Sequence, residues 1–424
     1  MAEAAPAIHT LANGVRVVCD PMPGLETLAL SVVVGRGSRW ETPAQSGWAH
    51  LLEHMVFKGA GERSARDIVE VIEAEGGQIN AATGHDRTSY QVRALRGGLT
   101  LGAEVIADLV WRPTIRADDL EREKTVVGQE IAEAADTPDD LVFELAQGQA
   151  FAGQPLGRPI LGQPKTVASA TSESLKAFHA GLYGPDAIVI GAAGAVDEED
   201  LLRLTERLFS ETAKAPAPPP VSPARFAGGQ VVKAKALEQA HLVLLLPAFG
   251  VRDPDYFALR LFAEILGGGM SSRLFQEVRE HRGLAYAIDA YADTHSDAGV
   301  LGVYAGTSAD DATEAAKVAA GQVKAMTQGV EAAELARAKA QMKSATFMAR
   351  ESALARAEQA AGQVLVFDRL FSPAETAQSI DEVSADDIVR VGMRILAERA
   401  CACAVLGPKR STGAGRAYED ALFG

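Results

Sequence analysis

A proline-rich stretch near the middle of the chain is the feature that most constrains its fold. Residues 214–225 read Lys-Ala-Pro-Ala-Pro-Pro-Pro-Val-Ser-Pro-Ala-Arg, a composition that favours a semi-extended linker over a packed element. The chain has 424 residues, more than one simple hydrophobic core usually holds. We therefore expect two domains, over residues 1–213 and 231–424, joined by a linker over residues 214–230.

The two halves on either side of this linker share one order of elements. Each opens with an apolar segment typical of a strand, at residues 28–34 and 241–247. A loop with an arginine and an acid follows each strand, and a helical pattern follows each loop. Because order, spacing and type all match, we favour a duplication over two unrelated domains.

The strongest chemical signal is a pentapeptide in the first half, His50-Leu-Leu-Glu53-His54. Residues i, i+3 and i+4 of a helix share one face, so both imidazoles can bind one metal ion with the carboxylate beside it. Zinc with three protein ligands keeps a position open for water and lowers the pKa of that water to about 7. Glu53 would then act as the general base. The pattern is H-x-x-E-H, the inverted form of the H-E-x-x-H metalloprotease signature.

The alternative is an ordinary helix whose histidines are surface or core residues. Residue frequencies alone would give roughly 0.02 such matches in a chain with 8 histidines and 56 acidic residues. The flanking residues are apolar, and two histidines and a glutamate in buried surroundings need a charged partner. A cation satisfies all three groups, so we favour the metal site.

A third ligand is expected in the acidic helical segment over residues 118–135. Glu123 and Glu130 are seven residues apart and share one helix face. Helical spacing alone does not choose between them, and an acidic helix is also typical of a solvated surface.

Charge and hydropathy narrow the possible partners. The formal net charge of −15 disfavours a nucleic-acid partner and favours basic substrates by long-range attraction. No stretch reaches the roughly 18 continuous apolar residues of a membrane span, and the first thirty residues show no secretory signal pattern. We expect a cytoplasmic location with no membrane span.

Several ordered sequence blocks resemble the pitrilysin/insulinase-type (inverzincin) zinc peptidases, in particular the short two-domain group that includes mitochondrial processing peptidase and bacterial relatives. The resemblance runs from about residue 11 to residue 406. Its blocks are residues 47–59, 76–81, 130–131, 136–140, 155–162 and 266–275. It implies an α+β fold of two structurally similar domains, each a mixed or antiparallel sheet with helices packed on one face.

The same resemblance implies roles for residues near the motif. It assigns Glu130 as the third zinc ligand, alongside His50 and His54, and Glu123 as a supporting residue that orients a ligand. Asn80, Ala81 and Ala82 match an edge strand that pairs with an extended peptide substrate. Phe57 matches an aromatic residue in the pocket just after the cleaved bond.

Further roles are implied for the second half and for a helix in the first. Arg279 matches a residue that holds substrate carbonyls, and Tyr286 matches one whose hydroxyl stabilises the tetrahedral oxyanion. Asp140 and Glu144 match acids that hold a substrate arginine in the processing peptidases, although a solvated acidic patch accounts for them equally well. His85 stands where the family usually has an arginine, and we interpret it as a surface or substrate-side residue.

The function that follows is a zinc metalloendopeptidase, with one Zn²⁺ per chain, that cleaves peptides or unfolded segments in a closed chamber. Because the chain holds both the zinc motif and the Arg279/Tyr286 pair, we expect a homodimer and not pairing with a zinc-less partner. The alternatives are a non-catalytic scaffold or assembly subunit of the same family and a hydrolase of non-peptide amides. Only the motif itself supports the last.

Overall fold

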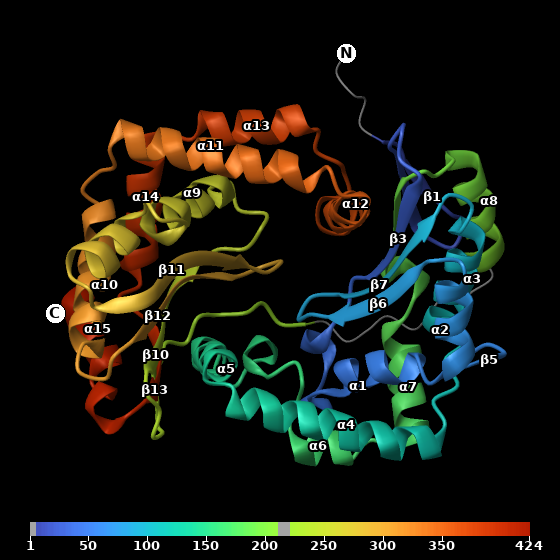
Figure 1. Cartoon of the computed structure of the whole chain (residues 1–424), viewed down its shortest axis with the longest axis horizontal. Helices are drawn as coiled ribbons and strands as arrows, with labels where there is room; N and C mark the ends of the chain where they lie inside the picture. Colours follow the sequence, from blue (N-terminus) through green and yellow to red (C-terminus); the bar gives the residue numbers. More distant parts are fainter. Residues whose placement is uncertain (1–5, 211–220) are drawn as a thin grey trace. The chain divides into compact units, whose positions relative to one another are not determined.

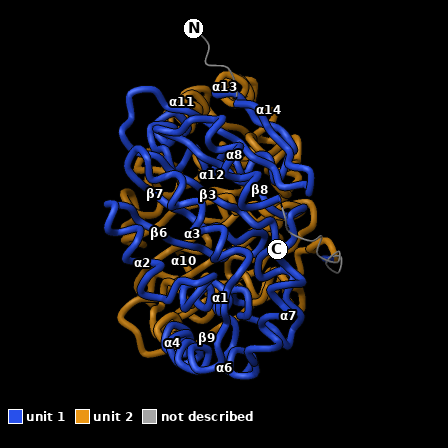
Figure 2. The backbone as a smooth tube through the Cα atoms, turned by 90° about the vertical axis from the view of Figure 1, so that its right-hand side faces the viewer, with its two compact units in different colours: residues 1–131, 159–221, 346–373 blue, residues 132–158, 222–345, 374–424 orange. Residues whose placement is uncertain are grey.

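The structure, a computed structural model, describes residues 6–210 and 221–424. They form two compact units, each built from three separate segments of the chain (Figure 2). Unit 1 comprises residues 1–131, 159–221 and 346–373, and unit 2 comprises residues 132–158, 222–345 and 374–424. None of the helices in the described part is long and apolar enough to cross a bilayer.

Unit 1 is built on a mixed sheet with the strand order β1-β2-β8-β3-β7-β6. Figure 1 labels β1, β3, β7 and β6 of this sheet. The strands are β1 (Ile8–Thr10), β2 (Arg16–Pro21), β3 (Thr27–Val34), β6 (Gln78–Thr83), β7 (Thr88–Leu95) and β8 (Ile188–Gly194). β2 and β8 run parallel, and the other neighbours are antiparallel. The described strands pair with β6 only through β7, which makes β6 an edge strand.

The main core of unit 1 lies between this sheet and the helices on one of its faces. The helices of the unit are α1 (Trp48–Val56), α2 (Ala65–Ala74), α3 (Leu99–Trp111), α4 (Ala117–Asp136), α6 (Pro164–Ala168), α7 (Ser172–Leu182), α8 (Glu198–Phe209) and α12 (Ala353–Phe367). A short hairpin of β4 (Gly59–Ala60) and β5 (Arg63–Ser64) follows α1. α4 continues a few residues past the boundary of the unit.

Unit 2 repeats this plan with the strand order β11-β12-β10-β13-β9. Its strands are β9 (Gly229–Ala234), β10 (Ala240–Ala248), β11 (Ala285–Thr294), β12 (Gly299–Thr307) and β13 (Ala402–Gly407). Its helices are α5 (Pro138–Ala150), α9 (Tyr256–Gly267), α10 (Ala312–Met326), α11 (Ala332–Ala349), α13 (Pro373–Glu382), α14 (Ala385–Ala397) and α15 (Ala414–Phe423). The order β2-β8-β3-β7-β6 of unit 1 matches β9-β13-β10-β12-β11, and the first pair of each is parallel. The α+β fold of two similar domains is confirmed.

A helix from the other half of the sequence covers the second face of each sheet. In unit 1, Ala360 and Val364 of α12 pack on Val18 and Val33 of the sheet. In unit 2, α5 packs in the same way on residues of β10, β12 and β13. Each sheet is therefore covered by helices on both faces, whereas the sequence resemblance implies helices on one face only. The second face is covered because its residues are also apolar.

The units consequently do not follow the chain in the way that the expected domains 1–213 and 231–424 do. Residues 132–158 of the first half belong to unit 2, and residues 346–373 of the second half belong to unit 1. Nothing in the local sequence of either helix states which sheet it covers. Residues 214–220 of the expected linker lie outside the described residues.

A buried ion pair ties α12 to the sheet of unit 1. Nε of Arg356 donates to Asp20 in β2 at 2.6 Å, and a second guanidinium nitrogen donates to the other carboxylate oxygen at 2.5 Å. Both side chains are less than a tenth exposed. Such a bidentate pair fixes both the register and the orientation of the helix on the sheet.

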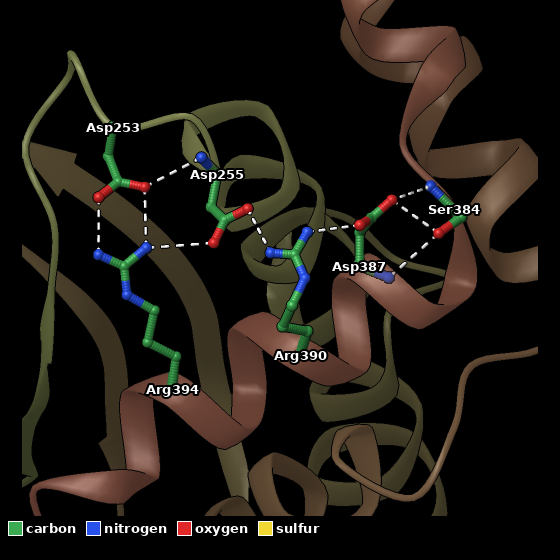
Figure 3. Close-up of polar contacts among 6 residues, drawn as sticks. All are labelled: Asp253, Asp255, Ser384, Asp387, Arg390 and Arg394. Atoms are coloured by element: carbon green, nitrogen blue, oxygen red, sulfur yellow. Dashed lines mark hydrogen bonds and ion pairs between the residues drawn. The ribbon is translucent and has the colours of Figure 1, made fainter.

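In unit 2, a network of acids and arginines joins α14 to the loop before α9 (Figure 3). Arg394 bonds both oxygens of Asp253, at 2.8 and 2.7 Å, and Arg390 bonds Asp255 at 2.6 Å. The hydrogen bond from Arg394 holds the pKa of Asp253 below its usual value. The acids before α9 are thus engaged by arginines of a neighbouring helix.

Candidate metal centre

The helix that carries the His-x-x-Glu-His motif begins at a glycine that no other residue could replace without rearrangement. Gly47 has a φ of 91°, and a Cβ there would clash with Gly162. The buried carboxylate of Glu41 accepts hydrogen bonds from the backbone N–H groups of Gly47 and Ala49, at 3.0 and 2.8 Å. An anion is favoured at a helix N-terminus, so Glu41 fixes where α1 starts.

The apolar face of α1 sets the direction of the motif. The side chains of Leu51, Leu52, Met55 and Val56 are fully buried in the core of unit 1. His50, Glu53 and His54 are left half-buried on the other face. Their orientation therefore follows from helical periodicity, as the sequence predicts.

α4 brings Glu130 to the two histidines. Oε2 of Glu130 lies 3.7 Å from Nε2 of His50 and 3.5 Å from Nε2 of His54. One ligand atom from each of the three side chains lies within 4.8 Å of the others. The two imidazole rings meet edge to face, with their centroids 4.6 Å apart. Three side chains from two helices thus present nitrogen and oxygen donors to one point.

The electrostatics of the two histidines suit a metal ion. Burial, with a smaller contribution from His54, lowers the pKa of His50 to about 4, so this imidazole is neutral at pH 7 and keeps a lone pair. Nδ1 of His54 lies 3.1 Å from Oε2 of Glu123. We assign the proton to this nitrogen, which leaves the lone pair of Nε2 directed at Glu130. Two imidazole nitrogens and a carboxylate oxygen are a ligand set that fits zinc.

Two further side chains at the centre carry no signal in the local sequence. Oγ1 of Thr83, the last residue of β6, donates a hydrogen bond of 2.5 Å to Oε2 of Glu53. Burial raises the pKa of Glu53, and this hydrogen bond opposes the rise. Nζ of Lys58 lies 2.8 Å from Oε1 of Glu123. Lys58 falls within the sequence block that carries the family resemblance, but nothing in the block indicates its partner.

The substrate-side residues expected in unit 1 lie next to the motif or on the edge strand. Phe57 follows the last residue of α1 and packs, partly buried, against the core of the unit. In β6, Asn80 and Ala82 are exposed and Ala81 is buried. His85 bonds Ser38, with Nδ1 and Oγ 3.0 Å apart, and is not part of the group of possible metal ligands.

The remaining candidates belong to unit 2. Arg279 lies in a seven-residue helix, Phe275–His281, with its guanidinium carbon 4.9 Å from the centre of the Tyr286 ring. Tyr286, near the start of β11, is 75% exposed. Asp140 and Glu144 lie one turn apart on α5, and both are exposed. Asp140 and Glu144 lie one turn apart as their i, i+4 spacing predicts, and Arg279 lies beside Tyr286. The roles of all four residues stay predictions.

Comparison with known proteins identifies the family. A model described as insulinase, peptidase family M16, matches residues 16–164, and a model of the peptidase M16 inactive domain matches residues 169–342. A protein of Rickettsia bellii named an uncharacterized zinc protease is 36% identical over 96% of this chain and 98% of its own length. A protein of the same description from Streptomyces coelicolor is 33% identical over 97% of this chain and 91% of its own.

Solved structures share the fold. A protease from Helicobacter pylori has a TM-score of 0.88 at 22% identity, over 95% of this chain and 99% of that one. A peptidase M16 inactive domain from Pseudomonas fluorescens has a TM-score of 0.88 at 21% identity, over 96% and 98%. The sequence matches over both units, together with this fold, show that the chain belongs to the insulinase family of zinc peptidases, peptidase family M16.

Proposed function

We propose that this protein is a zinc metalloendopeptidase that cleaves peptides or unfolded protein segments. The observation that carries the proposal is the convergence of His50, His54 and Glu130, with ligand atoms within 4.8 Å of one another. Glu53 lies on the same helix between the two histidines. A zinc ion bound there would act as a Lewis acid, lowering the pKa of water and polarising a peptide carbonyl.

Glu53 supplies the general base. Thr83 donates to Oε2 of Glu53, so we assign the other oxygen, Oε1, to take the proton of the attacking water. The same carboxyl group can then give this proton to the leaving amine, so that the proton taken from water ends on the amine nitrogen. The Thr83 hydroxyl keeps the carboxylate aimed, which spares the reaction the cost of ordering it.

The edge strand β6 is our proposed docking site for the substrate backbone. An extended peptide would pair with the free edge of β6 and read main chain more than side chains, with Asn80 and Ala82 exposed beside it. Thr83 ends this strand and bonds Glu53. A peptide paired with β6 is thereby brought toward the base.

Unit 2 is proposed to contribute to substrate stabilisation. As the sequence resemblance implies, the Tyr286 hydroxyl would stabilise the developing oxyanion, and Arg279 would bind substrate carbonyls. The stacking of the Arg279 guanidinium near the Tyr286 ring supports a joint role. The closed chamber, the homodimer and the cytoplasmic location stay predictions.

A non-catalytic scaffold of the same family is the second candidate. The fold resembles a chain in the complex III2 of Candida albicans, with a TM-score of 0.86 at 20% identity over 98% of this chain and 99% of that one. That likeness concerns the fold alone. The convergence of His50, His54 and Glu130, with Glu53 on the same helix as the two histidines, favours catalysis, because a scaffold needs none of these residues.

The proposal is tested by cleavage of an internally quenched fluorescent peptide. The purified protein should cleave the peptide, lose activity when a chelator removes the metal, and regain it when zinc is added. His54→Ala should abolish both zinc binding and cleavage, whereas the control His9→Ala, which alters a histidine paired with Glu198 outside the site, should leave both intact. Full zinc occupancy with no cleavage of a varied peptide library would favour the scaffold.

A further inference from the structure

A chain of two contacts runs from one zinc-ligand candidate, through a glutamate, to a lysine outside the ligand group. Nδ1 of His54 lies 3.1 Å from one oxygen of Glu123, and Nζ of Lys58 lies 2.8 Å from the other. The Glu123 side chain is only 7% exposed. Each oxygen of this buried carboxylate thus has its own donor, an imidazole on one side and an ammonium on the other.

The position of Lys58 is fixed by the turn that ends α1. The backbone N–H of Lys58 donates to the carbonyl of Met55 at 3.1 Å, and Gly59 follows with a φ of 149° that favours glycine. The carbonyl of Gly59 accepts hydrogen bonds from both the backbone and the side chain of Thr114. The lysine therefore projects from an anchored turn, and its side chain is about two-thirds covered.

We infer that Lys58 is a positioning residue for the metal centre, acting on His54 through Glu123. A largely buried carboxylate that loses its cationic partner is left with an uncompensated charge, and it gains freedom to rotate away from the imidazole. Carboxylates that hold a metal-binding histidine by its second nitrogen typically raise metal affinity by a factor of roughly 10 to 100. Lys58 supplies the charge that keeps Glu123 in that role. This inference rests on the proposed zinc site.

The two histidines differ in a way that makes this support matter. Within the described residues, Nδ1 of His50 is buried and has no hydrogen-bond partner. His54, in contrast, is held at Nδ1 by Glu123. Among the described residues, Nδ1 of His54 therefore has a hydrogen-bond partner and Nδ1 of His50 has none. Weakening the contact between Glu123 and His54 should reduce the order of the whole ligand set.

The test measures zinc affinity of the metal-free protein by competition with a chromophoric chelator. Lys58→Met should weaken zinc binding by a factor of about 10 to 100, and Lys58→Arg, which keeps the charge, should bind zinc more tightly than Lys58→Met. The matched control is Lys124→Met, since Lys124 also pairs with a glutamate, the exposed Glu121 on α4. The control should bind zinc as the wild type does. If Lys58→Met does not fold, Lys58→Gln takes its place under the same criteria.

A double-mutant cycle separates positioning from a general loss of stability. Glu123→Gln should weaken zinc binding, and adding Lys58→Met to it should change little, because the lysine acts through the glutamate. In metal-free protein with ¹⁵N-labelled histidine, the Nδ1–H signal of His54 should be protected in the wild type and exchange faster in Lys58→Met. Wild-type zinc affinity in Lys58→Met, or fully additive effects in the cycle, would overturn the inference. These measurements do not depend on peptide cleavage. If the protein binds zinc as inferred but cleaves no peptide in the separate cleavage test, the proposed function is wrong and this inference still stands.

Discussion

The two units share a strand order but differ in one helix, which follows β3 in unit 1 and β10 in unit 2. In unit 1 this helix, α1, presents two histidines and a glutamate on its less buried face. In unit 2 the counterpart α9 has no histidine, and a Cβ at Gly267 would clash with the backbone of Ala290 in β11. At Gly267, α9 thus packs closely against its neighbouring strand. The two units thus share a fold although only the helix of unit 1 carries the His-x-x-Glu-His residues, as expected for a duplication in which one copy kept the metal site.

Acidic groups at the two helices show the same contrast. Asp253 and Asp255 before α9 are bonded by two arginines of α14 (Figure 3), an arrangement that joins elements within unit 2. In unit 1, one carboxylate oxygen of Glu123 contacts Nδ1 of His54 in the candidate metal centre. The acids before α9 thus join elements within unit 2, whereas Glu123 in unit 1 contacts a residue of the candidate metal centre, where we propose that it orients a ligand.

The largest effect is expected from the base in unit 1. Glu53→Gln should lower kcat by a factor of roughly 10² to 10⁴ while zinc remains bound, because the carboxylate is not among the three ligand candidates. The measurement is kcat together with zinc content. The matched control is Glu264→Gln on α9 of unit 2, which should retain activity. Near-normal kcat in Glu53→Gln with zinc bound would show that the mechanism is wrong.

The next effect concerns α12, the helix from the second half of the sequence that packs on the sheet of unit 1. Arg356→Met leaves Asp20 buried without its partner, which should cost about 3–5 kcal/mol of unfolding free energy. Hydrogen exchange should speed up in β2, β3 and β8 of unit 1 and much less in the strands of unit 2. The control, Arg96→Met, breaks an exposed pair with Glu26 and should cost only about 0–1 kcal/mol. Equal losses in the two variants would mean that the ion pair does not hold α12.

A smaller effect is expected in unit 2, from the proposed oxyanion donor. Tyr286→Phe should lower kcat by a factor of about 10² to 10³ with little change in KM, because the hydroxyl acts mainly in the transition state. Tyr291→Phe on the same strand, β11, is the control and should have little effect. If both variants are equally active, unit 2 takes no part in the chemistry through Tyr286.

The smallest effect tests substrate charge. Asp140→Asn with Glu144→Gln should reduce a preference for arginine two residues before the cut by a factor of about two to five, the scale of an exposed ion pair. Cleavage of neutral peptides should hardly change. The control removes two acids from α4, Asp118→Asn with Glu121→Gln, and keeps the preference. If both double variants keep the same preference for arginine, Asp140 and Glu144 do not bind the substrate and are only surface charges.

The sequence predicts the parts of this structure that local patterns encode. The repeated order of elements predicts the duplication, and the i, i+3, i+4 spacing predicts that His50, Glu53 and His54 share a face. The choice between Glu123 and Glu130 could not come from helical spacing, because both lie on the same face of α4. It required the family resemblance, and the structure brings Glu130 to both Nε2 atoms.

Other features depend on contacts between distant residues and leave no local signal. Ala357, Ala360, Ala361 and Val364 of α12 pack on the sheet of unit 1, and nothing in their local sequence shows that this sheet is built by the other half of the chain. Thr83 and Lys58 are ordinary residues in sequence. Their roles appear only when the fold places one beside Glu53 and the other beside Glu123.

The most direct test of the difference between the units is anomalous diffraction at the zinc absorption edge from crystals of the purified protein. Among the described residues, one group of potential ligands meets the geometric requirement, and it belongs to unit 1. We predict one anomalous peak per chain, bound by His50, His54 and Glu130, with no peak in unit 2. A fully zinc-loaded protein with its peak elsewhere, or with a second peak in unit 2, would contradict the account.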